Sequence, residues 1–167
     1  MEPLTLVREG VDFNYWARDR QLKACAVLSA DDFARPLGGS FPSLRETFAH
    51  MVAVEWLWVA RWRGRTVKAL IPASEFPTLA VVAERWSAVE REVREFVNEL
   101  DEESLKRPLI CTSTRGEQWT YPLWRLIVHF LNHQSYHRGQ VTTLLRMLGV
   151  TPPRIDYLLG VDADFAR

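Results

Sequence analysis

The chain has 167 residues, of which 47% are hydrophobic and 25% charged, the balance of a soluble globular protein. Lysine plus arginine equal aspartate plus glutamate, at 21 each, so no net charge favours nucleic acid or an acidic membrane as a partner. No run of 18 apolar residues is present, and no secretory segment opens the chain. We therefore expect one cytoplasmic domain, 1–167, with Cys25 and Cys111 as free thiols.

Apolar residues recur at helical spacing in four segments, which predicts four long helices. The predicted ranges are about 4–28, 43–62, 78–100 and 122–148. Ser43 and Glu46 match a capping box at the start of the second helix, and Gly149 follows the fourth. Ser29 and the next three residues are interpreted as a stop and a loop.

Residues 107–121 have a different pattern, with β-branched and aromatic residues on both sides of Arg115-Gly116-Glu117. This pattern favours a short β-hairpin before the last helix. Two longish connections, from the second helix to the third and from the third to the fourth, exclude a simple up-down-up-down order. The expected fold is therefore all-α, a four-helix bundle with this hairpin as an addition.

Charged residues between the apolar positions are interpreted as solvated faces. In the first helix, this interpretation places Arg8, Asp12, Arg18 and Asp19 in water. In the third helix, a block of alternating charges that includes Glu90 and Arg94 is likewise expected to face water.

The four histidines are the strongest functional signal. His129, His133 and His137 recur every four residues in the last helix, and His50 lies midway along the second. Imidazoles four residues apart share a helix face and can reach one metal ion. His129 and His137 are separated by about 12 Å of helix, so they cannot bind the same ion. Spacing alone leaves two pairs open, His129 with His133 or His133 with His137, each with His50 as the third ligand.

The surroundings of these histidines favour a metal site. Both histidine-bearing helix faces are largely apolar, and converging imidazoles in such a core need a shared partner. Helical phase places Glu46, Tyr136 and Gln140 near the ligands, where Glu46 and Gln140 could orient them. The chain has no His-Glu-x-x-His and no Gly-x-Ser-x-Gly, which excludes a zinc protease and a serine hydrolase of those types.

The chain has seven tryptophans, which are expected mainly in the core or in a subunit interface. Trp56, Trp58 and Trp62 lie on more than one face of the second helix. This placement predicts that some of them cover a partner subunit, and we expect a homodimer.

The string His129-Phe-Leu-Asn-His133-Gln-Ser-Tyr-His137-Arg-Gly-Gln140 resembles the signature of the DinB family. Asn14-Tyr-Trp-Ala17 resembles the early aromatic motif of that family, and Thr120-Tyr-Pro-Leu-Trp124 its run into the last helix. The resemblance spans nearly the whole chain.

This resemblance implies a bundle with up-down-down-up connections, often dimeric, that holds zinc or nickel through His50, His133 and His137. His129 then becomes a residue of the second shell or the pocket. Arg138 lies off the ligand face and is expected to serve packing or an interface. The better-understood relatives resemble thiol-dependent enzymes, namely transferases that use bacillithiol or mycothiol and a maleylpyruvate isomerase.

Three protein ligands leave coordination positions open, which is typical of a catalytic metal site. We therefore expect an enzyme that activates a small thiol for transfer to a small-molecule electrophile. One alternative is a metal-dependent hydrolase with Glu46 as the general base. The other is a dimeric module that binds metal or ligand without catalysis.

Overall fold

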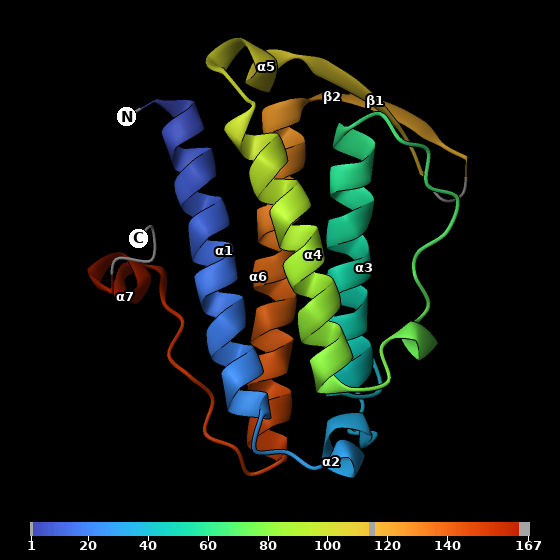
Figure 1. Ribbon diagram of the computed structural model, residues 1–167, viewed down its shortest axis with the longest axis vertical. Coiled ribbons are helices and arrows are strands. Elements are labelled where there is room, and N and C mark those ends of the chain that lie inside the picture. The colour runs from blue at the N-terminus through green and yellow to red at the C-terminus, as the bar shows by residue number, and fades with distance from the viewer. Residues whose placement is uncertain (1, 114–115, 164–167) are drawn as a thin grey trace.

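Four long helices lie side by side in the computed structural model, which describes residues 2–113 and 116–163 (Figure 1). They are α1 (Pro3–Cys25), α3 (Leu44–Trp62), α4 (Leu79–Asn98) and α6 (Leu123–Met147). Helix α1 contacts α4 and α6, and α3 contacts the same two helices from the other side. In the view of Figure 1, α1 and α6 run downward while α3 and α4 run upward.

The predicted helix starts are confirmed at two caps. The hydroxyl of Ser43 accepts a hydrogen bond from the amide of Glu46 at 3.4 Å, and that of Thr78 accepts one from Val81 at 3.3 Å. Each oxygen satisfies an amide that has no partner inside the helix. The cap at Ser43 fixes where α3 begins, and therefore where His50 lies along it.

Short elements connect the long helices. They are α2 (Ala30–Ala34), the 3-10 helix η1 (Ala73–Glu75), α5 (Glu102–Lys106) and α7 (Tyr157–Asp162). The loop predicted after Ser29 is wrong, because the Ser29 hydroxyl accepts from the amide of Asp32 and starts α2. Phe33 then buries its ring against Phe48, which holds this single turn in place. Helix α7 packs on α1, with the rings of Phe13 and Tyr157 5.1 Å apart.

The predicted hairpin is confirmed by an antiparallel pair of strands, β1 (Pro108–Thr112) and β2 (Gln118–Pro122). Ile110 lies opposite Thr120, and β2 runs directly into α6. Arg115 of the predicted turn lies outside the described residues. The hairpin therefore places β2 beside the first turns of α6.

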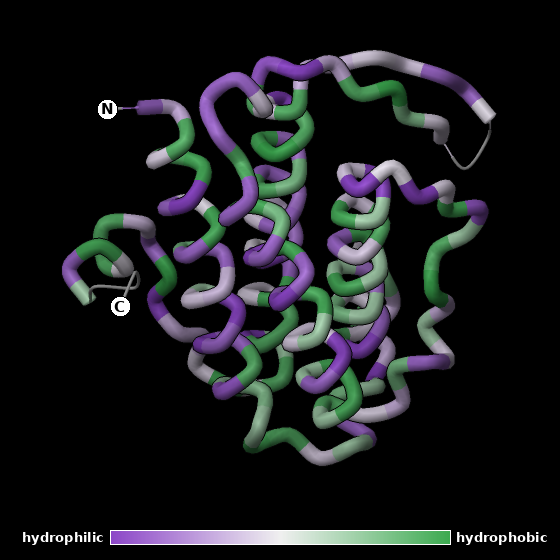
Figure 2. Tube along the Cα trace, turned by 45° about the horizontal axis from the view of Figure 1, so that its top comes forward, coloured by the Kyte–Doolittle hydropathy of each residue, from purple (hydrophilic) through white to green (hydrophobic). Residues whose placement is uncertain are grey.

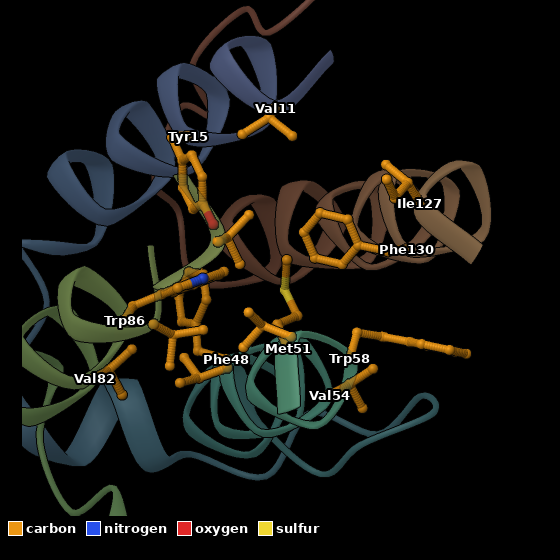
Figure 3. Close-up of a cluster of buried hydrophobic side chains, with 14 of the residues drawn as sticks. Val11, Tyr15, Phe48, Met51, Val54, Trp58, Val82, Trp86, Ile127 and Phe130 are labelled. Carbon is orange, nitrogen blue, oxygen red and sulfur yellow. The ribbon is translucent and has the colours of Figure 1, made fainter. Parts of the chain in front are cut away.

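All four long helices contribute to one apolar core, part of which is drawn in Figure 3. The labelled side chains come from α1 (Val11), α3 (Phe48), α4 (Trp86) and α6 (Phe130). Hydrophobic and hydrophilic residues are mixed along the long helices (Figure 2), as expected of helices that turn an apolar face to the core. None of the helices in the described part of the chain is long and apolar enough to cross a membrane.

The tryptophans of α3 lie mainly inside the chain itself. Trp62 is 2% exposed and Trp58 6%, whereas Trp56 is half-buried. Trp62 packs against Phe96 and Phe130. The homodimer expected from these residues stays a prediction.

The solvated face predicted for Arg18 is wrong. Its side chain is buried, with Nη2 2.6 Å from a carboxylate oxygen of Glu90, and its guanidinium lies 4.7 Å from the centre of the Tyr15 ring. Glu90 is half-buried and also pairs with Arg94. An ion pair between α1 and α4 allows both charges to leave water, and local helical spacing contains no sign of it.

Candidate metal centre

Three histidines meet where α3 and α6 pack together. His50 belongs to α3, and His133 and His137 lie one turn apart on α6. The Nε2 atom of His133 is 3.1 Å from Nε2 of His50 and 3.1 Å from Nε2 of His137. One ligand atom from each residue lies within 4.8 Å of the other two, so the group could hold a metal ion.

The spacing of these nitrogens suits a first-row metal ion. Imidazole nitrogens bind zinc at about 2.0–2.1 Å, and neighbouring ligands are about 90–110° apart in octahedral or tetrahedral sites. Two such nitrogens are then about 2.9–3.4 Å from each other. The two contacts of 3.1 Å fall within this range.

Hydrogen bonds alone cannot satisfy the Nε2 atoms of these three histidines. Nδ1 of His137 donates to the side-chain oxygen of Gln140 at 2.7 Å, so Nε2 of a neutral His137 carries a lone pair. If Nε2 of His133 is protonated, its one proton must serve both neighbours. If Nε2 of His133 is unprotonated, its lone pair faces that of His137. A cation shared by three lone pairs removes this conflict, and the residues therefore fit a metal ion.

The protein keeps these imidazoles neutral. Burial and, to a smaller extent, the nearby His137 lower the pKa of His50 to about 4. Burial and the surrounding histidines lower the pKa of His133 to about 3. Burial also lowers the pKa of His137, although the bond to Gln140 opposes this shift. At neutral pH, all three lone pairs are available to a cation.

Groups around the histidines fix their rings. The amide nitrogen of Gln140 donates to the hydroxyl of Ser40 at 2.8 Å, which orients the oxygen of Gln140 toward His137. Phe41 stacks on His50 with ring centres 4.4 Å apart and lies 5.6 Å from His137. Ser40 and Phe41 precede α3 in a loop, so periodicity gave no sign of either residue.

The contact of Gln140 leads to a testable prediction. A Gln140→Leu variant removes the acceptor that selects the tautomer of His137, and we expect the affinity for Zn²⁺ to fall about 10- to 100-fold. Competition with a chromophoric chelator measures this loss. A Thr143→Val variant, on an exposed position of the same helix, serves as the control. Equal affinities for Gln140→Leu and the control would contradict the role of Gln140.

His129 and Tyr136 lie beside the cluster. The ring of His129 is 6.4 Å from that of His133 and 5.2 Å from that of Trp58, and His129 is outside the group of three. Tyr136 is 63% exposed and meets His137 edge-on at 5.2 Å. Both residues border the metal centre.

Glu46 lies in the cap of α3 and outside the group of three. Its carboxylate accepts hydrogen bonds from the Ser43 hydroxyl and the Arg45 guanidinium. Burial opposes the ionisation of Glu46, but these bonds outweigh it and lower its pKa. The carboxylate is therefore ionised and engaged in the cap, and its role as a general base stays a prediction.

Arg138 lies on the other side of α6, as its helical phase predicts. It is buried and donates to the side-chain oxygen of Asn14, which belongs to the early aromatic motif. Burial lowers the pKa of Arg138 to about 10, although the charge of Glu55 opposes this shift. Arg138 therefore connects α6 to α1 inside the protein.

Both cysteines are free, as expected, and both are buried. Burial raises the pKa of the Cys25 thiol to about 12 and also raises that of Cys111, where Arg61 opposes it. Neither thiol is activated as a nucleophile.

Comparisons with known proteins agree with this architecture. The model of the DinB family matches residues 3–164. The chain is 23% identical to Protein DinB of Bacillus subtilis over 156 residues, which cover 87% of this chain and 88% of that protein. It is 20% identical over 148 residues to the uncharacterized protein YizA of the same organism, with 88% of this chain and 91% of that protein covered.

A crystal structure of a DinB-like protein from Bacillus cereus has a similar fold. Its TM-score is 0.65 at 19% identity, and the match covers 84% of this chain and 91% of that one. The family match extends over almost the whole sequence and includes all three clustered histidines. The chain belongs to the DinB family.

Proposed function

We propose that this protein is a metal-dependent enzyme that binds Zn²⁺ or Ni²⁺ through His50, His133 and His137 and transfers a small thiol to an electrophile. The convergence of three Nε2 atoms carries the proposal. Among the described residues, the group contains no fourth histidine, cysteine or carboxylate. Coordination positions therefore remain for exogenous ligands, as in catalytic rather than structural sites.

A divalent cation lowers the pKa of a thiol or water that it binds, so that the nucleophile forms near neutral pH. The chain's own residues prepare this site. Burial keeps the imidazoles unprotonated, Gln140 fixes the tautomer of His137, and Phe41 covers His50 against water. The reacting thiol comes from a second molecule, because both cysteines of the chain are buried and protonated.

We infer that α1, α3, α4 and α6 form one domain, a four-helix bundle with up-down-down-up connections. Their mutual contacts and the directions visible in Figure 1 support this inference. The transfer of a thiol is supported by the family resemblance. The cytoplasmic location stays a prediction.

The reaction can be tested with purified protein loaded with Zn²⁺ or Ni²⁺. Cysteine or bacillithiol is supplied together with 1-chloro-2,4-dinitrobenzene, in which the thiolate sulfur replaces chloride and the thiol proton passes to buffer. We expect metal-dependent formation of the thioether, lost in His50→Ala. The absence of metal-dependent turnover, with no change in the Ni²⁺ absorption spectrum when thiol is added, would reject the proposal.

A further inference from the structure

A pocket of about 420 Å³ opens beside the metal centre, under the hairpin. It is lined by one residue of α3, two of β2 and three of α6, namely Trp58, Trp119, Tyr121, Arg125, Leu126 and His129. Its size lies within the range of about 300–1,000 Å³ that is usual for sites of small molecules. It is therefore large enough for a reactant.

The walls of this pocket are flat and aromatic. The ring of Trp119 is 5.8 Å from that of Trp58 and 5.8 Å from that of Tyr121. Trp58 meets His129 edge-on at 5.2 Å. Aromatic walls of this kind favour planar apolar molecules, which stack on them or meet their edges.

The charge around the pocket is positive. Arg125 lines it, and the guanidinium of Arg61 lies 5.4 Å from the ring centre of Trp58 and 5.8 Å from that of Trp119. Arg61 donates to the carbonyl of Thr112, and in the described part of the chain no carboxylate pairs with Arg61 or Arg125. None of the lining residues is acidic. An anionic group on the ligand would meet Arg125, a cation that lacks a counter-charge, with a second cation, Arg61, on the neighbouring indole rings.

The pocket and the metal centre share one side of α6. His129 lines the pocket, and its ring is 6.4 Å from that of His133, one helical turn further along. A molecule seated against Trp58 and His129 therefore lies about one helical turn from His133, the metal ligand that follows His129 on α6.

We propose that this pocket binds a planar aromatic molecule with an anionic group, packed against Trp58 and Trp119 and paired with Arg125. We further infer that this molecule is the electrophile of the reaction, which rests on the proposed function. Binding itself does not, because the lining residues are separate from the three histidines.

Titration calorimetry with 2-naphthoate tests the proposal, with 2-naphthalenemethanol as the neutral molecule of similar shape. Both metal-free and zinc-loaded protein are used, because a carboxylate could also bind the metal. We expect 2-naphthoate to bind both forms at least about fivefold more tightly than the alcohol. Trp119→Ala should weaken binding of both molecules about 3- to 10-fold. Arg125→Gln should remove the preference for the anion, and Arg146→Gln, near the other end of α6, should not.

Shifts of the Trp58 and Trp119 indole resonances in the unmodified protein give a second measurement that does not depend on the folding of a variant. Equal affinities for the anion and the alcohol would overturn the proposal. Binding that requires zinc and ignores Arg125→Gln would also overturn it. If ligands bind in the pocket but the protein transfers no thiol, the proposed reaction is rejected and the binding proposal stands.

Discussion

Replacing His133 with alanine is expected to lower the affinity for Zn²⁺ by more than about 100-fold. Loss of an outer hydrogen bond to a ligand costs about 10- to 100-fold, and loss of the ligand itself should exceed this. His133 is the member whose Nε2 lies 3.1 Å from both of the others, so its removal breaks both contacts of the cluster. Competition with a chelator at pH 7.5 measures the change, and circular dichroism checks that the helices persist.

The matched control is His129→Ala, one turn earlier on the same helix. His129 is exposed and outside the group of three, so we expect its removal to change the affinity by less than about threefold. This pair of variants separates the two ligand sets that spacing leaves open. An equal loss in both variants would show that the ion is bound by another set.

Replacing Glu55 with alanine is expected to destabilise the protein by about 2–6 kcal/mol at pH 6. Glu55 is fully buried, and the oxygens of its carboxyl group accept from the Tyr15 hydroxyl and, at 2.6 Å, from the Trp86 indole. Each buried donor left without a partner costs about 1–3 kcal/mol. Urea unfolding of the metal-free protein measures the loss. A change below about 1 kcal/mol would contradict a structural role for these bonds.

The Glu55→Gln variant has nearly the same shape and isolates the charge. Burial raises the pKa of Glu55 from 4.5 to about 7, against the hydrogen bonds from Tyr15 and Trp86 and the charge of Arg18. The folded protein therefore retains a proton that the unfolded chain releases. This contribution to stability is fully present below pH 4.5 and is lost as the pH rises through about 7.

Between pH 5 and pH 8, the free energy of unfolding should therefore fall more for the unmodified protein than for Glu55→Gln. The histidines titrate in the same way in both proteins, so their contribution to the free energy of unfolding cancels in the comparison. A difference that does not vary with pH would show that Glu55 is ionised throughout this range.

The sequence predicted the helices well because their signals are local. The cap at Ser43 and the glycine after α6 fix the ends of the two helices that carry the histidines. Hydrophobic periodicity then fixes the faces that turn inward. Helix α2 was missed because its single turn is held by Phe33 packing on Phe48, a contact with another helix.

The spacing of the histidines in the sequence is not enough to identify the three metal ligands. Both histidine pairs on α6 are geometrically equivalent in the sequence, and only the offset of α6 against α3 brings His50 to His133 and His137. His129 instead turns toward Trp58. This offset depends on packing along the whole length of both helices, which no local pattern contains.

Buried charges were the least predictable part of the fold. Arg18 pairs with Glu90, 72 residues away, and Arg138 bonds to Asn14 across 124 residues. Within its own helix, Arg18 alone resembles a residue exposed to water. Partners on another helix allow its burial, and they are found only once the helices are placed.

X-ray absorption spectroscopy of the zinc-loaded protein tests whether His50, His133 and His137 bind the ion together, because it counts the imidazole ligands around the metal. We predict one ion per chain, with three imidazole nitrogens at about 2.0–2.1 Å and at least one further ligand from outside the chain. A spectrum with fewer than three imidazoles, or one unchanged in His133→Ala, would contradict this prediction.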